Sequence, residues 1–129
     1  MDKREKRAQS LLWEVQALRA AGNVEEAAKK SRSMAKLHEE LADERLGARD
    51  PRGWIHLQAA ATAWAKAGRD DDFARAFRLL AKGIDLSLSG RLKNHDVLNE
   101  LFRLCDWARS RQPKEPAPAE RSTKRRAVA

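Results

Sequence analysis

Two stretches decide the fold of this chain: residues 8–35, AQSLLWEVQALRAAGNVEEAAKKSRSMA, and residues 54–81, WIHLQAAATAWAKAGRDDDFARAFRLLA. In each stretch, apolar residues recur three and four positions apart, which is the period of one face of an α-helix. A glycine then interrupts the pattern, Gly22 in the first stretch and Gly68 in the second, before another helical pattern begins. Each stretch therefore predicts a helical hairpin.

The second stretch repeats the first at an offset of 46 residues, without a gap. The matched positions include Ala8 and Trp54, Leu11 and Leu57, Leu18 and Trp64, Gly22 and Gly68, and Ala35 and Ala81. Self-similarity at a fixed offset is the sequence signature of stacked repeats. We therefore expect the two hairpins to be copies of one unit that stack on each other.

The complete pattern predicts an all-α chain of about five helices in a single domain over residues 1–111. The expected parts are hairpin 1 over residues 3–46, hairpin 2 over residues 51–89, a C-terminal capping helix over residues 94–111 and a tail over residues 112–129. The tail is rich in proline and basic residues, so we expect it to be disordered.

Local signals mark the expected helix starts. Asn23, followed by Glu26 three residues later, has the pattern of a capping box at the start of the second helix. Asp50-Pro51 is typical of the start of the third helix. The acidic run Asp70-Asp71-Asp72 is typical of the start of the fourth helix, where the helix dipole is positive.

Composition limits the partners and the compartment. The chain of 129 residues has a net charge of +8, which favours anionic partners such as nucleic acid or an acidic protein. It contains a single cysteine, which is typical of a reducing, cytoplasmic location. The N-terminus has no pattern of a signal peptide, and no apolar run reaches the roughly 20 residues that span a bilayer. We expect no contact with membranes.

Each hairpin resembles a tetratricopeptide unit, and the second resembles it more closely. The resemblance lies in Trp54-Ile55-His56-Leu57, Ala67-Gly68-Arg69 and Asp72-Phe73-Ala74, and it extends over residues 8–89. The repeat is longer than the family's usual period of about 34 residues, and the closing proline is absent. A five-helix bundle of coincidentally similar hairpins is the alternative.

Basic residues also repeat on the polar side. Their spacing of three and four puts Lys29, Arg32 and Lys36 on one helical face, and Arg75, Arg78 and Lys82 follow at the repeat offset. If the hairpins stack in register, these six residues, here called the basic stripe, form a surface that attracts phosphates. The tail adds Lys124, Arg125 and Arg126. We expect a non-enzymatic accessory protein that binds nucleic-acid backbone, as a subunit of a larger nucleoprotein complex.

The resemblance to tetratricopeptide units implies an alternative function, that of an adaptor for protein–protein interactions. Its groove would lie between the first and third helices, lined by Glu14, Gln16, Gln58 and Thr62. A homo-oligomer that forms through the open first helix is a further possibility.

No catalytic or metal-binding pattern is visible, so we expect no enzymatic activity, cofactor or metal. The histidines His38, His56 and His95 stand far apart on different predicted helices, and none has the spacing of a ligand pair. Cys105 lies on an apolar stripe, where a buried small side chain is expected. Among the tryptophans, Trp13, Trp54 and Trp64 are expected to be buried. For Trp107, the sequence does not decide between burial and exposure.

Overall fold

The computed structural model describes residues 2–88 and 95–111, and these residues form five α-helices and no strand. The helices are α1 (Lys3–Ala20), α2 (Val24–Gly47), α3 (Gly53–Ala67), α4 (Asp70–Leu88) and α5 (His95–Arg111). The prediction of an all-α chain of about five helices is confirmed. The predicted tail over residues 112–129 lies outside the described residues.

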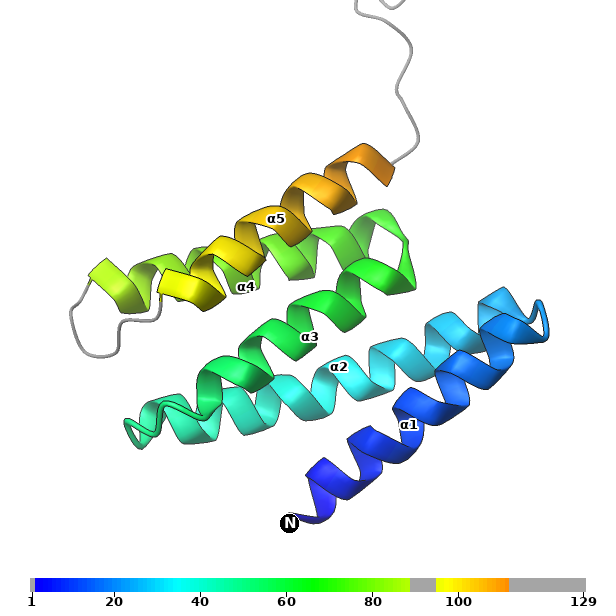
Figure 1. The fold of residues 1–129 in the computed structure, drawn as a ribbon, viewed down its shortest axis with the longest axis horizontal. Helices are drawn as coiled ribbons and strands as arrows, with labels where there is room; N and C mark the ends of the chain where they lie inside the picture. The colour runs from blue at the N-terminus through cyan, green and yellow to red at the C-terminus, as the bar shows by residue number, and fades with distance from the viewer. Residues whose placement is uncertain (1, 89–94, 112–129) are drawn as a thin grey trace, which may run out of the picture.

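Neighbouring helices pack as pairs, with α3 at the centre (Figure 1). α1 lies against α2, α2 against α3, and α4 against α5, while α3 also contacts α4 and α5. Trp54, Leu57, Ala61 and Trp64 of α3 are each at most 1% exposed. A helix that is apolar on most sides has to be enclosed by neighbours. The composition of α3 therefore explains its place between the first hairpin and the α4–α5 pair.

The turn between α1 and α2 is closed by backbone hydrogen bonds. Gly22 has a φ of 80°, its N–H donates to the carbonyl of Arg19 at 3.0 Å, and the N–H of Asn23 donates to the carbonyl of Leu18 at 2.8 Å. These two bonds form a Schellman motif. The prediction of a capping box by Asn23 and Glu26 is wrong, because the Asn23 side chain makes no capping hydrogen bond. Closing α1 holds Asn23 at a ψ of 74°, outside the extended conformation of most capping residues.

The turn between α3 and α4 is fixed by the acidic start of α4. Gly68 has a φ of 87°, and the carboxylate of Asp72 accepts a hydrogen bond from the N–H of Arg69 at 3.1 Å. The same carboxylate pairs with Arg32 of α2 at 2.9 Å. Asp72 therefore closes its own turn and links the second hairpin to the first.

Several apolar residues at the two ends of the stack are exposed. Trp13 is 65% exposed, so the prediction that it is buried is wrong. The reason is that α1 is the outermost helix and packs on one side only, against α2. Val24, at the start of α2, is also exposed, as is Phe102 of α5. Trp54 and Trp64 are buried as predicted, since they lie on the central helix.

Within the described ranges, no helix combines the length and the apolar character needed to cross a membrane.

Candidate functional site

A groove with a volume of about 360 Å³ lies between α1 and α3, with α2 as its floor. The sequence predicted a groove between these helices, and three of the four side chains predicted to line it do so: Gln16, Gln58 and Thr62. The fourth, Glu14, lies outside the lining and approaches Lys30 of α2 at 3.7 Å. The prediction for Glu14 is therefore wrong, because an ion pair with the neighbouring helix holds its carboxylate elsewhere.

The walls of the groove are apolar and accessible. Leu12 of α1 is 41% exposed and Ile55 of α3 is 66% exposed, and both side chains line the groove. Val15 and Met34 lie deeper between the same helices and are buried. Apolar side chains in a groove with a few polar groups are typical of a site that takes an apolar ligand in a fixed orientation.

Two cations lie in the groove wall, Arg19 at the end of α1 and Lys66 at the end of α3. The guanidinium of Arg19 donates a hydrogen bond to the backbone carbonyl of Lys66 at 3.1 Å, which joins the two helix ends. The groove lining contains no carboxylate. This end of the groove therefore carries positive charge that no acidic side chain of the lining neutralises.

Polar groups lie at the floor and in the walls of the groove, and one of them holds α2 against α3. The hydroxyl of Ser31, which is 1% exposed, donates to the carbonyl of Ala63 at 2.7 Å. The hydroxyl of Thr62 donates to the carbonyl of Gln58 at 2.9 Å, so its oxygen can only accept a further hydrogen bond. The amides of Gln16 and Gln58 supply both donors and acceptors to the groove.

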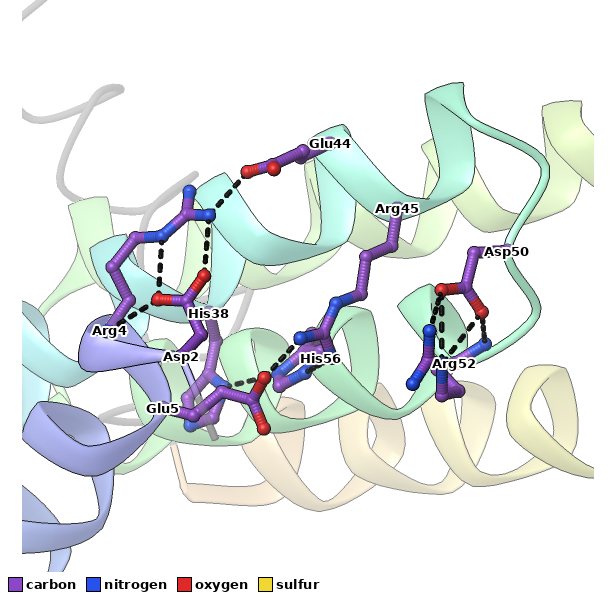
Figure 2. A network of polar contacts seen from close by, with 9 residues as sticks. All are labelled: Asp2, Arg4, Glu5, His38, Glu44, Arg45, Asp50, Arg52 and His56. Atoms are coloured by element: carbon purple, nitrogen blue, oxygen red, sulfur yellow. Dashed lines mark hydrogen bonds and ion pairs between the residues drawn. The ribbon is translucent and has the colours of Figure 1, made fainter.

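His38 at the floor of the groove forms a pair with His56 of α3, although the histidines were predicted to stand far apart. The Nδ1 atoms of His38 on α2 and His56 on α3 are 2.9 Å from each other. Arg45 contacts Nε2 of His56 at 2.7 Å and forms an ion pair with Glu5 of α1 (Figure 2). The expectation is wrong because antiparallel packing of α2 and α3 brings together residues that lie 18 positions apart.

Both imidazoles of the pair are neutral at pH 7. Burial, with a smaller contribution from the nearby His56, lowers the pKa of His38 to about 4. Burial also lowers the pKa of His56, with a contribution from the positive charge of Arg45. The hydrogen bond from Arg45 lowers the pKa of Glu5, so that the carboxylate stays charged beside the neutral pair.

Half of the basic stripe is paired with carboxylates. The Nε of Arg32 lies 3.0 Å from both oxygens of Asp72, which is 3% exposed. Lys82 pairs with Asp43 of α2. Lys29 pairs with Glu26 at 3.3 Å. Arg32 in particular links α2 to α4 through its ion pair with Asp72, and less of the stripe than predicted is available to a phosphate.

Two of the three remaining cations of the stripe lie beside a second hollow. Lys36 and Arg75 line a space of about 190 Å³ together with Arg69, next to the Arg32–Asp72 pair. The guanidinium of Arg75 lies over the ring of Trp64, 4.5 Å from its centroid, in a cation–π contact. The structure thus brings one residue of each row of the stripe to the same hollow. Arg78 is exposed on α4.

The other residues named from the sequence lie away from the groove or outside the described ranges. Lys124, Arg125 and Arg126 lie outside the described residues. Cys105 is 3% exposed, and burial raises the pKa of its thiol, as fits a packed side chain. Over the described part of the chain, no group of three or more histidine, cysteine or acidic residues is placed to hold a metal ion.

Comparison with known proteins returns no matching family model, curated protein or solved structure, so the groove and the basic stripe are interpreted from their own residues.

Proposed function

We propose that this chain is a protein-interaction module that binds a segment of a partner protein in the groove between α1 and α3. The groove is the observation that carries the proposal. It combines exposed apolar walls at Leu12 and Ile55 with the polar side chains Gln16 and Gln58. Its place between the first and third helices also agrees with the adaptor function that the tetratricopeptide resemblance implies.

Charge indicates which segment fits. Arg19 and Lys66 lie in the lining, and no carboxylate of the lining offsets them. A bound segment with an aspartate or glutamate near the ends of α1 and α3 would supply the missing negative charge. Its apolar side chains would cover Leu12 and Ile55. The proposed occupant is therefore an acidic segment with apolar anchors.

Selection from a randomised peptide library on the full-length chain tests this proposal. We expect selected peptides to be enriched in acidic and apolar residues. Ile55→Glu should weaken their binding at least about tenfold, because it puts a carboxylate into an apolar wall and repels the acidic peptide. Val24→Glu is the matched control, since Val24 is 69% exposed, Ile55 is 66% exposed, and Val24 lies outside the groove.

Two results would contradict the groove as the binding site. One is a library that yields no peptide for the wild-type chain. The other is peptides that bind Ile55→Glu and Val24→Glu equally well. Peptides that prove to be copies of the chain's own sequence would mean instead that the groove joins two copies of this protein.

Binding of nucleic-acid backbone is the second candidate function. Lys36, Arg69 and Arg75 line one hollow, together with Asp71 and the Arg32–Asp72 pair. The ion pairs of the stripe involve Lys29, Arg32 and Lys82, so Lys36 and Arg75 are left for a phosphate. Such a cluster would bind phosphates irrespective of base sequence, as a subunit of a nucleoprotein complex could.

A salt series with fluorescent DNA and RNA tests the second candidate. The double variant Lys36→Glu, Arg69→Glu should reduce both the affinity for nucleic acid and its salt dependence. Lys66→Glu is the matched control, because Lys66 lies in the groove. A chain that ends at Arg111 reports what the tail contributes. Absence of binding even at low salt would remove this candidate.

A further inference from the structure

The histidine pair has a defined arrangement of protons. The guanidinium of Arg45 can only donate, and it lies 2.7 Å from Nε2 of His56, so that nitrogen accepts. A neutral His56 then carries its proton on Nδ1 and donates to Nδ1 of His38 at 2.9 Å. Because His38 accepts at Nδ1 and is neutral, its own proton lies on Nε2.

Three helices hold this arrangement in place. The ring planes of His38 and His56 are 27° apart and their centroids are 5.2 Å apart, so the rings meet edge to edge along the hydrogen bond. Arg45 of α2 is anchored by Glu5 of α1, while His56 belongs to α3 (Figure 2). A proton on Nδ1 of His38 would break its hydrogen bond with His56, unless the proton of His56 moved to Nε2 and broke the bond with Arg45 instead.

The Nε2 atom of His38 is accessible. Its ring lines the groove and also a neighbouring hollow of about 270 Å³ beside Leu12 and Met34. Within the described residues, the buried side-chain atoms that lack a hydrogen-bond partner are Glu14 Oε2, Trp54 Nε1 and Ser87 Oγ. Nε2 of His38 is not one of them and makes no hydrogen bond, so solvent or a ligand reaches it.

We propose that the Nε2–H of His38 is a fixed hydrogen-bond donor at the floor of the groove, and that the bound segment places a backbone carbonyl over it. This inference rests on the proposed function of the groove and adds how the segment is oriented. Arg45 and His56 are positioning residues, because they act on the segment only through the tautomer of His38. A donor held in one orientation between apolar walls fixes the register of an extended segment.

Imidazole nitrogen NMR of the full-length chain at pH 7 tests the proton arrangement without any ligand. We expect Nε2 of His38 and Nδ1 of His56 to be protonated. Arg45→Met should shift both rings towards mixed tautomers, and Arg45→Lys, which keeps a donor, should restore the wild-type signals. A wild-type spectrum with the proton of His38 on Nδ1 would overturn the inference, whatever binds in the groove.

Peptides selected on the wild-type chain test the donor itself. His38→Leu should bind them roughly tenfold more weakly, since it leaves their carbonyl unpaired. His38→Gln should retain most of the affinity, because its amide nitrogen can replace Nε2 as the donor. His95→Leu on α5 is the control away from the groove. The melting temperature of each variant reports whether it has folded.

The outcomes separate this inference from the function on which it rests. Peptides that bind His38→Leu as well as wild type, but fail to bind Ile55→Glu, would overturn the role of His38 and leave the groove in place. Failure to select any peptide, or binding that survives Ile55→Glu, would overturn both.

Discussion

The groove face and the basic face of this molecule carry similar cations in different surroundings. On the basic face, α4 supplies the carboxylate of Asp72 to Arg32, and α2 supplies a carboxylate to Lys82. In the groove, Arg19 and Lys66 have no carboxylate beside them in the lining. A row of basic residues on one helix therefore does not show how much charge is available to a ligand. The packing of the next helix decides it.

The largest effect on stability is expected at Arg32, the residue of the basic stripe whose ion pair is most deeply buried. Arg32→Ala should lower the free energy of unfolding by about 2 kcal/mol, because it leaves the buried carboxylate of Asp72 without its partner. Arg78→Ala, on the exposed face of α4, should change it by less than about 0.5 kcal/mol. Urea unfolding of both variants measures the difference. Equal effects would mean that the Arg32–Asp72 pair contributes nothing beyond a surface contact.

A smaller effect is expected from the pH dependence of the histidine pair. The pKa of His38 is lowered to about 4 in the folded chain, against about 6.5 in the unfolded chain. The unfolded state therefore binds more protons between these values, and stability falls as the pH drops from about 6.5 to about 4. We expect a loss of about 1–2 kcal/mol, since partial exposure of the ring reduces the full effect.

Charged groups from the packed helices also act on the pair. Glu5 and Asp2 favour the protonated form of His56, while Arg45 and Arg4 oppose it. His38→Gln removes the titrating group and should flatten the curve over this range, as followed by urea unfolding at several pH values. A variant whose curve matches that of wild type would show that His38 does not carry the effect.

The smallest effect on stability is expected in the walls of the groove. Ile55→Glu and Val24→Glu should each change the free energy of unfolding by less than about 0.5 kcal/mol, because both side chains are exposed. The same variants should differ strongly in peptide binding. A large loss of stability in Ile55→Glu alone would mean that this wall serves packing, and the comparison of the two faces would have to be revised.

The helices of this chain were predictable because local periodicity and glycine positions determine them. The contacts between helices were harder to predict from the sequence. The sequence shows that Ser31 interrupts an apolar stripe, but only the crossing of α2 and α3 shows that its hydroxyl meets the carbonyl of Ala63. The His38–His56 contact depends in the same way on the register of two antiparallel helices.

Position in the stack limited the remaining predictions. Trp13 has apolar residues beside it on its helix face, as residues of a central helix do. However, α1 packs against α2 on one side only, so the Trp13 side chain is exposed. The groove between the first and third helices was predictable, because stacked hairpins place these helices side by side. Its charge was not, because Glu14 turns towards Lys30 and leaves the groove without a carboxylate.

The most direct test of the groove as the binding site is an NMR titration of the backbone amides with a peptide selected on the full-length chain. The proposal predicts that the largest shifts occur in the groove, at Gln16, Ile55, Gln58 and Lys66. Shifts that cluster instead at Lys36, Arg69 and Arg75 would place the ligand on the basic face and contradict the account.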